Sequence, residues 1–482
     1  MILSKNFLET YLEKEEFYSL IDGKERSSPN KTPSILSSPS DEKFRKKILF
    51  VGAKETEEAV SVAHNRLESW HSVPAAQKAA KLREVARLLE SNGNLLADVM
   101  ALEMGKCVKE GMGEVKYTAG FFTWYAGECE RVYGKIIPSS HAGKNLQVIY
   151  EPVGVSGIIT PWNFPLAMPA RKIAAALAAG CTVVAKPSPE TPISMLLLAK
   201  ICYEAGIPEG ALNIVIGPEK EIGSILSSDF RVRKISFTGS TEVGKILYAG
   251  SASTMKKLTL ELGGHAPLIV FDDADLEVAV RETIAAKFRN NGQTCISANK
   301  ILVQADIYDS FMEKFIEKVK MLKIGNPFDP TTDIGNVLHP QSAARVRDHL
   351  EDALAKGADP VYITENIFEP KILTEITPGM RIFCEETFGP IAPITKFTHD
   401  REALLLANSG DYGLASYVFT QNIHRIRNAI SHLHYGIIGI NEGVPSCPQA
   451  SFGGLRNSGL GREGGPSGIY EYLSEKYICM AF

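Results

Sequence analysis

The sequence has 482 residues, of which 44% are hydrophobic, so it can bury two or three cores of the usual domain size of about 100–200 residues. Its formal net charge is −4, and basic and acidic residues are interspersed along the chain. No basic stripe is present to follow a phosphate backbone, which excludes nucleic acid as the expected partner.

The N-terminal segment and the cysteines indicate where the protein works. MILSKNFLETYLEKEE has neither the apolar core of a secretory signal nor an Arg-rich, acid-poor character, and no apolar run approaches the roughly 18 residues of a membrane span. The eight cysteines are scattered, without CxxC pairs or histidines at metal-ligand spacing. We therefore expect free thiols in a reducing cytoplasm, with no metal and no membrane contact.

The predicted elements start after a Ser- and Pro-rich connection at residues 27–40, with helical periodicity at 56–70 and 75–110. From Val153 onward, short β-rich runs alternate with helical ones. Five strands separated by four helices of this length predict a parallel, doubly wound α/β sheet with helices on both faces. The β-rich runs are VGVSGIIT, TVVAK, LNIVIG, KISFTG and KKLTLEL, and the helical patterns cover residues 169–179, 193–205, 219–227 and 242–251.

Doubly wound sheets bind ligands outside the carboxyl ends of their strands, so the residues at those ends are candidates for a site. A single polar residue there is usually a solvated cap, and only the convergence of several favours a site. The Gly-Ser-Thr turn that opens the last helix suits a pyrophosphate, because free N–H groups and the helix dipole attract anions. The strand-end residues are Thr160, Pro161, Trp162, Asn163, Lys186, Gly217, Gly239, Ser240, Thr241 and Glu261.

Two glycine-rich stretches imitate nucleotide motifs. Residues 459–464, GLGREG, fit GxGxxG, but the last strand-like run ends at Asn441 and no βαβ unit follows, which favours a turn. Residues 239–246, GSTEVGKI, nearly form a P-loop, but Ile246 stands where a hydroxyl must bind Mg²⁺. A nucleotide hydrolase is therefore disfavoured.

Cys295 is a candidate nucleophile. A helix that begins near Asp275 is stopped by the sequence NNG at 290–292, which places Cys295 in a short connection before a strand at 300–304. An isolated cysteine is usually an inert packing group, and a free thiol titrates near about 8.5, so Cys295 needs activation by its neighbours.

Glu261 and Asn163 offer the other groups that acyl chemistry needs. The alternation in LTLELGG points Glu261 out at the end of its strand as an acid or base, and Gly263-Gly264 then lets the backbone turn sharply. Asn163 is either an ordinary turn residue or a neutral donor to a developing oxyanion. His265 is the nearest histidine, the partner that a cysteine hydrolase would require. A thiol, a carboxylate and an amide beside a dinucleotide-type sheet predict covalent oxidation of an aldehyde.

Seven motifs make the chain resemble the NAD(P)-dependent aldehyde dehydrogenases from end to end: ITPWNFP, KPSPETP, FTGSTEVG, LELGGHAP, FRNNGQTCISAN, EETFGP and FGGLRNSGLGREGG. The resemblance implies that Cys295 is the nucleophile, Glu261 the general base and Asn163 the oxyanion donor. Phe452 would line the substrate channel. The residues implied for NAD(P) are Thr160, Pro161, Trp162, Lys186 (adenine ribose), Ser188, Pro189, Gly239, Ser240, Leu262, Glu386 (nicotinamide ribose) and Phe388.

The resemblance also implies three parts. They are a cofactor-binding domain at 1–132 and 152–262, a catalytic α/β domain at 263–455, and oligomerisation segments at 133–151 and 466–482. The hairpin at 133–151 would join a partner subunit in a homodimer or homotetramer. The C-terminal EKYICMAF would extend a sheet across that interface as an exposed edge strand.

Within the family, KFRNNGQTCISANKILVQ, INEGVPS and YLSEKYICMAF most resemble bacterial succinate-semialdehyde dehydrogenases. A carboxylate tail needs cations, and the planar guanidinium of arginine binds a carboxylate through two hydrogen bonds. The resemblance assigns this role to Arg171, Arg289 and Ser446, although surface ion pairing is an alternative for both arginines. We therefore expect succinic semialdehyde, or another short or ω-carboxylated aldehyde, as the substrate.

Several positions depart from the family pattern. NAD-preferring members commonly carry a glutamate three residues after the equivalent of Lys186, where this chain has Pro189, with Glu190 one place later. Loss of that carboxylate removes repulsion against a 2′-phosphate, so we expect NADP or NAD with NADP favoured. Ser297 replaces the second cysteine of a redox switch found in some animal relatives. PSCPQAS at 445–451 differs from the subgroup, so recognition of the tail can have drifted.

Two other classes of function fit parts of the pattern. A cofactor-independent cysteine esterase would use Cys295 without NAD(P) and needs a histidine within reach. A non-catalytic oligomer would be unaffected by Cys295→Ala, but gives no reason for three reactive groups at one sheet edge. An acyl-CoA-forming dehydrogenase is disfavoured because the deacylating base, Glu261, is present.

Overall fold

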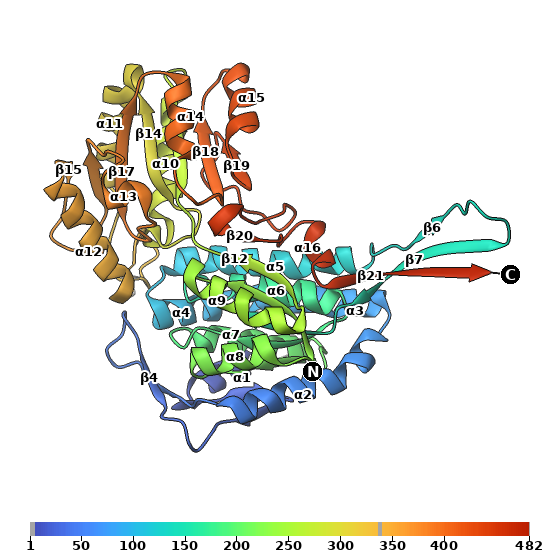
Figure 1. Cartoon of the computed structure of the whole chain (residues 1–482). Helices are drawn as coiled ribbons and strands as arrows, with labels where there is room; N and C mark the ends of the chain where they lie inside the picture. The colour runs from blue at the N-terminus through green and yellow to red at the C-terminus, as the bar shows by residue number, and fades with distance from the viewer. Residues whose placement is uncertain (1–4, 336–339, 482) are drawn as a thin grey trace.

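The computed structural model describes residues 5–335 and 340–481, which form two large sheets with their helices, a small N-terminal sheet and a projecting arm (Figure 1). None of the helices within the described residues is long and apolar enough to cross a membrane.

The first sheet has eight strands in the order β20-β12-β11-β8-β9-β10-β2-β3, and its five central strands are parallel. These are the five runs that the sequence predicts, so the doubly wound α/β interpretation is confirmed. Every residue of β9 is buried, as strands covered by helices on both faces require. The strands are β2 (Ser19–Ile21), β3 (Lys24–Arg26), β8 (Val155–Ile159), β9 (Thr182–Lys186), β10 (Leu212–Ile214), β11 (Val232–Thr238), β12 (Lys257–Glu261) and β20 (Gly459–Leu460), and the connecting helices are α6 (Ala167–Ala178), α7 (Pro192–Glu204), α8 (Glu219–Ser228) and α9 (Thr241–Ser251).

The N-terminal part covers this sheet with further helices. The predicted helical stretch at 75–110 is three helices, because Asn92 separates α3 from α4 and Gly105, at φ 77°, ends α4 in the left-handed conformation. The Ser- and Pro-rich segment is more ordered than predicted, since it contains a strand of a three-stranded sheet, β1-β5-β4. The elements are α1 (Lys5–Leu12), β1 (Glu16–Phe17), β4 (Ser34–Ser37), β5 (Arg45–Ile48), α2 (Ala53–His71), α3 (Ala75–Ser91), α4 (Gly93–Met104) and α5 (Val108–Cys129).

The second sheet has seven strands in the order β15-β16-β17-β14-β13-β18-β19, all parallel except β15. Its strands are β13 (Ala266–Val270), β14 (Ala298–Gln304), β15 (Asp359–Tyr362), β16 (Lys371–Thr374), β17 (Ile391–Phe397), β18 (Ala415–Phe419) and β19 (Ile437–Ile440). Its helices are α10 (Leu276–Phe288), α11 (Ala305–Lys320), α12 (Pro340–Ala355), α13 (Arg381–Cys384), α14 (Asp400–Asn408) and α15 (Ile423–His432). Short elements elsewhere are η1 (Ala252–Thr254), η2 (Arg289–Gly292), η3 (Arg456–Ser458) and α16 (Ser467–Tyr470).

The connection between the sheets positions the site. The chain leaves the carboxyl end of β12 at Glu261 and enters the amino end of β13 at Ala266, while Cys295 lies just before the amino end of β14. The carboxyl edge of the first sheet therefore faces the amino edge of the second.

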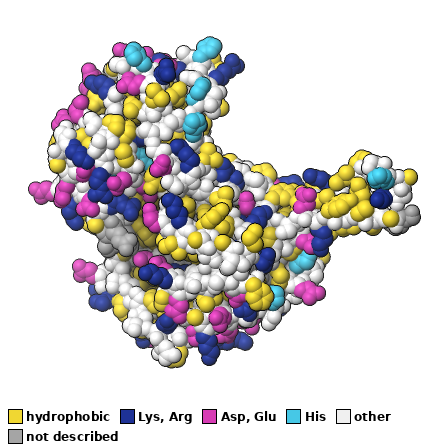
Figure 2. All heavy atoms as spheres, viewed as in Figure 1, with side chains coloured by type: hydrophobic (Ala, Val, Ile, Leu, Met, Phe, Trp, Pro, Cys, Tyr) yellow, Lys and Arg dark blue, Asp and Glu magenta, His cyan; other side chains and the backbone are white. Residues whose placement is uncertain are grey.

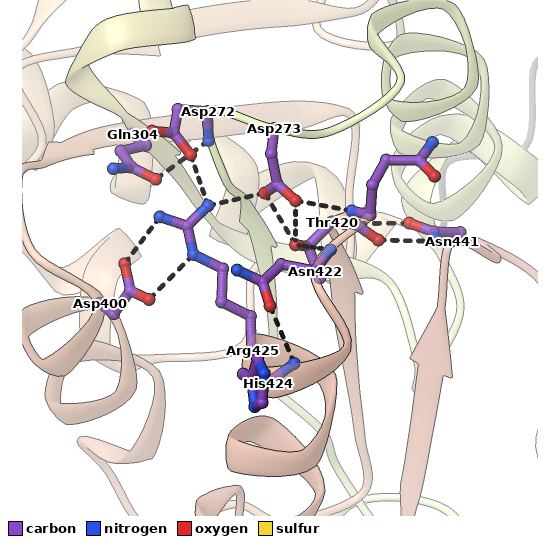
Figure 3. Close-up of polar contacts among 10 residues, drawn as sticks. Asp272, Asp273, Gln304, Asp400, Thr420, Asn422, His424, Arg425 and Asn441 are labelled. Atoms are coloured by element: carbon purple, nitrogen blue, oxygen red, sulfur yellow. Dashed lines mark hydrogen bonds and ion pairs between the residues drawn. The ribbon is translucent and has the colours of Figure 1, made fainter.

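The opposite edge of the second sheet is closed by a cluster of charges (Figure 3). Arg425 of α15 pairs with Asp400 of α14 through Nε and Nη2, at 2.9 and 3.1 Å. Its Nη1 contacts Asp272 and donates to Asp273 at 2.6 Å, just after β13, and Asp273 also accepts from Thr420 at 2.7 Å. This cluster fixes two helices to the sheet at the end remote from Cys295.

A three-stranded arm, in the order β21-β7-β6, projects from the body and carries the C-terminus at its tip (Figure 1). Its strands are β6 (Lys135–Ile137), β7 (Lys144–Pro152) and β21 (Leu473–Ala481). The C-terminal strand pairs along the whole of β7 in the same chain, which the sequence did not predict. Apolar side chains of the arm are exposed to solvent, with Ile136 80% and Tyr477 59% exposed (Figure 2). Such exposure is typical of an interaction surface.

Candidate active site

The loop that carries Cys295 follows a sharp reversal after α10. Asp275 caps the start of that helix by accepting a hydrogen bond from the Val278 N–H at 3.0 Å. At its end Asn290, Asn291 and Gly292 all have positive φ, at 51°, 56° and 73°. Asparagine tolerates this left-handed region better than most residues, so NNG turns the chain without a longer loop.

The backbone around Cys295 is held against the turn between the two sheets. A Cβ on Gly264 would lie 2.1 Å from the Cys295 carbonyl oxygen, so only glycine permits this approach. Neither Gly263 nor Gly264 has a positive φ, and the residues between β12 and β13 form no turn or bend, so close packing at Gly264 replaces the predicted sharp turn. The Tyr417 hydroxyl donates to the Ile296 carbonyl at 2.6 Å and fixes the other side of the loop.

One cavity opens beside Cys295 and encloses about 1090 Å³, counting the part open to solvent. The predicted site residues that line it are Pro161, Trp162, Asn163, Arg171, Gly239, Ser240, Leu262, Arg289, Cys295, Glu386, Phe388, Ser446 and Phe452. Thr160, Lys186, Ser188, Pro189 and Glu261 do not line it. Gly263, predicted only as part of a turn, also lines it, and the lining residues that the sequence did not single out are Tyr117, Phe164, Met168, Thr238, Thr294, Ile296, Ser342 and Arg345.

Asn163 is fixed at three points beside the Cys295 loop. Its Nδ2 donates to the Gln293 carbonyl at 2.9 Å. The backbone carbonyl of Asn163 accepts from Lys106 Nζ at 2.8 Å and from Asn290 Nδ2 at 3.1 Å. An amide has two N–H groups, so the hydrogen bond to Gln293 leaves one for a ligand.

Glu261 is 1% exposed and is not among the residues that line the cavity. Neither of its carboxyl oxygens has a hydrogen-bond partner among the residues that the structure describes. Burial raises the pKa of Glu261 well above its usual range, and the charge of Glu463 raises it further, whereas Arg171 and Lys172 lower it. Burial likewise raises the pKa of the Cys295 thiol to about 12, against the charge of Arg171, and Glu261 adds to that rise. The Cys295 thiol therefore holds its proton at neutral pH in this state.

Glu463 organises a buried ion cluster behind the cavity. Arg171 Nε donates to its carboxylate at 2.6 Å, Ser236 donates at 3.0 Å, and the Lys172 ammonium contacts it directly. Although burial opposes it, Lys172 and Arg171 hold the pKa of Glu463 below its usual value. The alternative of surface ion pairing is wrong for Arg171, since both partners are at most 3% exposed.

The two arginines differ in how firmly they are held. The Arg171 guanidinium lies 4.3 Å from the centre of the Phe452 ring, and its Nη1 is buried with no hydrogen-bond partner among the described residues. Arg289 is half-buried at the end of α10, with its guanidinium 5.7 Å from the centre of the Phe164 ring. Both reach the cavity, and their charges act against the burial that raises the pKa of Tyr117.

The same cavity also has the surfaces that a nicotinamide dinucleotide requires. Ser240 caps α9 by accepting from the Val243 N–H, which leaves a helix N-terminus facing the cavity. The edge of the Trp162 ring meets Phe388, at 5.9 Å between ring centres. Glu386 accepts from the Gly264 N–H at 3.0 Å, and burial raises its pKa to about 7. An anion cradle, apolar walls and a carboxylate fit phosphate, nicotinamide and ribose.

Lys186 lies outside the cavity, along the carboxyl edge of the first sheet. It is 3% exposed at the end of β9, and its carbonyl accepts from the Thr160 N–H at 3.1 Å. Burial lowers the pKa of Lys186, while Glu219 and Glu190 raise it. The Ser188 hydroxyl donates to Glu190, so a carboxylate remains close to this lysine although Pro189 occupies the family's usual position.

The sequence profile of the aldehyde dehydrogenase family matches residues 26–478. The chain belongs to this family. The dehydrogenase is 47% identical over 436 residues to the mitochondrial succinate-semialdehyde dehydrogenase of Oryza sativa subsp. japonica, a match covering 89% of this chain and 83% of that protein. It is 45% identical over 435 residues to the glutarate-semialdehyde dehydrogenase of Pseudomonas putida, covering 89% and 91%. A crystal structure described as an E. coli NADP dependent enzyme matches with a TM-score of 0.95 at 42% identity, covering 98% and 99%. The protein is thus an NAD(P)-dependent aldehyde dehydrogenase with the family's α/β fold.

Proposed function

We propose that this dehydrogenase oxidises a short aldehyde with an anionic tail, foremost succinic semialdehyde, and that Arg171, Arg289 and Ser446 hold the tail. The observation that carries the proposal is the Arg171 Nη1 group, which is buried beside the cavity without a hydrogen-bond partner among the described residues. A buried donor without a partner costs about 1–3 kcal/mol, which a substrate carboxylate would offset. The names of the rice and P. putida relatives, which act on semialdehydes of dicarboxylic acids, support this class.

In the proposed mechanism, the Cys295 thiol loses its proton to water, and Sγ adds to the aldehyde carbon while Asn163 Nδ2 and the Cys295 N–H donate to the oxyanion. NAD(P)⁺, held by the residues proposed for it in this cavity, would supply the acceptor for the hydride of this carbon. Glu261 then removes a proton from the water that attacks the thioester, which releases the acid and the thiol. The arrangement at the cavity supports these roles, because Asn163 is tied to the Cys295 loop and Glu261 acts on the thiol by charge.

A cysteine esterase is less well supported, because it needs a histidine base. His265 is 4% exposed, and its Nε2 lies 3.2 Å from the Ile382 carbonyl oxygen. Burial lowers its pKa to about 3, and it does not line the cavity. The His265 ring therefore contacts the Ile382 carbonyl and does not face Cys295 across the cavity as a base would.

We expect Arg289→Ala to lower kcat/KM for succinic semialdehyde by roughly 10- to 100-fold, since a charge-assisted hydrogen bond contributes about 1.5–3 kcal/mol. For butanal, which lacks a carboxylate, the same change should have little effect. Initial rates with both aldehydes measure this, with Arg281→Ala, a 66% exposed arginine of the same helix, as the matched control. Equal losses on both aldehydes would show that Arg289 does not recognise the tail.

For the cofactor, we infer that the enzyme uses both NADP⁺ and NAD⁺ and favours NADP⁺. Pro189 removes the family's usual ribose-binding carboxylate, but Glu190 stays close enough to act on Lys186. Glu190→Gln should therefore raise the ratio of kcat/KM for NADP⁺ over NAD⁺ by roughly 3- to 10-fold, the effect of removing about 1 kcal/mol of charge repulsion. Steady-state kinetics with each cofactor measure the ratio, and an unchanged or lowered ratio would show that Glu190 does not disfavour the 2′-phosphate.

The predicted assembly and location also stay proposals. We propose that the exposed arm, residues 133–151 with 466–482, joins copies of the chain into a homodimer or homotetramer, which its bare apolar side chains support. The proposed cofactor and catalytic domains meet at residues 262–263, in the connection between the two sheets. A cytoplasmic location remains an expectation from the sequence.

A further inference from the structure

One face of α5 carries charges that the proposed reaction does not use. Lys106 lies just before the helix, and Glu110 and Glu114 are one turn apart within it, on one face. Lys106 and Glu114 are each 1% exposed in their side chains, and Glu110 is half-buried. One turn further on, Tyr117 lines the cavity. Buried charges must be paired, so the partners of this face show what it holds.

Lys106 and Glu114 hold the segment that contains Asn163. The Lys106 ammonium contacts the Glu114 carboxylate and donates to the Asn163 carbonyl at 2.8 Å. The second Glu114 oxygen accepts from the N–H groups of Leu166 and Ala167, at 2.9 and 3.0 Å, at the start of α6. The ion pair thus fixes both the turn after β8 and the helix that follows it.

Glu110 holds the other loop. Its carboxylate accepts from the Asn290 N–H at 2.8 Å, within the left-handed turn that leads to Cys295. The Asn290 side chain in turn donates to the Asn163 carbonyl at 3.1 Å. The Asn163 turn and the Cys295 loop are therefore hydrogen-bonded to each other, and each is also hydrogen-bonded to residues of α5 or just before it.

We propose that Glu110 and Lys106 are positioning residues, which set the distance between the Asn163 amide and Cys295. This inference rests on the proposed function, because only in the proposed reaction do the Asn163 turn and the Cys295 loop bind an oxyanion together. A displacement of about 1 Å in a reacting site can cost roughly 100-fold in rate. Bonds from a rigid helix to the backbone of both loops prevent such a displacement.

A matched pair of variants at Glu110 separates the effect of side-chain length from the effect of the negative charge. Glu110→Gln keeps an acceptor of the same length for the Asn290 N–H, whereas Glu110→Asp keeps the charge but is too short to reach it. We expect Glu110→Asp to lower kcat roughly tenfold or more. Glu110→Gln should keep most of kcat, and the KM for NADP⁺ should be unchanged in both. Lys116→Ala, on the exposed side of α5, is the control.

Kinetics and thermal unfolding of the full-length enzyme decide the matter. Equal kcat values for the two variants, or a loss only in Glu110→Gln, would overturn the proposal. A lowered unfolding temperature with unchanged kcat would likewise leave Glu110 a purely structural role. Asn163→Ala, measured in parallel, should lose roughly 100- to 1000-fold in kcat. If Asn163→Ala has no effect, the proposed oxyanion site fails; if it does and Glu110→Asp does not, only the positioning role fails.

Discussion

Cys295→Ala should abolish aldehyde oxidation, with kcat lowered by roughly 10⁴-fold or more for every aldehyde, as is typical when a covalent nucleophile is removed. The reason is geometric as well as chemical. The Cys295 loop is locked by the close approach of Gly264 and by the Tyr417 hydrogen bond, so no neighbouring group can take the place of its sulfur. NAD(P)H formation, followed by absorbance with succinic semialdehyde, measures the loss.

Two controls make this result specific to the nucleophile. Cys479→Ala removes an exposed thiol of the arm and should leave kcat unchanged. Cofactor binding by Cys295→Ala, measured by fluorescence titration with NADPH, should match that of the unmodified enzyme, since the thiol is not among the groups proposed to hold the dinucleotide. Substantial oxidation by the alanine variant would exclude the covalent mechanism.

Glu261→Gln should convert steady turnover into a single burst. One equivalent of NAD(P)H per active site should form, after which the rate should fall roughly 100- to 10,000-fold, because nothing removes a proton from the attacking water. Rapid-mixing absorbance measures the burst and the slow phase. The neutral amide matches the protonated form that the raised pKa of Glu261 favours, so the variant should fold.

The same carboxyl group should shape the pH profile of the intact enzyme. A general base works only when it is ionised, and burial raises the pKa of Glu261. Turnover should therefore increase with pH, and the increase should occur at a higher pH than an ordinary carboxylate would give. This rising limb should be absent from the slow phase of Glu261→Gln. Glu277→Gln, at an exposed position of α10, should behave as the unmodified enzyme does. Full steady turnover by Glu261→Gln would assign deacylation to another base.

The five central strands of the first sheet could be predicted from sequence, because each is a short apolar run and helical patterns separate them, whereas β2, β3 and β20 were not predicted. The rule that ligands bind at carboxyl ends of strands also led to Asn163 and Glu261. The same rule does not find Cys295, which lies at an amino end of the second sheet, and only its local sequence suggested a role.

The charged residues behind the cavity could not be predicted in this way. The GLGREG stretch predicts only a turn, which holds at Gly461 and Gly464, where φ is positive, but Gly459–Leu460 form strand β20 against β12. Yet Glu463 within it accepts hydrogen bonds from Arg171, 292 residues earlier, and from Ser236 of β11. Glu110 and Tyr117 lie within an ordinary helical pattern. Contacts across such sequence distances leave no local signal.

The central claim is that Cys295 carries the acyl group while Asn163 and Glu261 serve it. Mass spectrometry of Glu261→Gln, quenched after mixing with succinic semialdehyde and NADP⁺, tests this most directly. The account predicts a succinyl group on the peptide that contains Cys295 and on no other cysteine. An unmodified Cys295 peptide after NADPH has formed, or the acyl group on another residue, would contradict it.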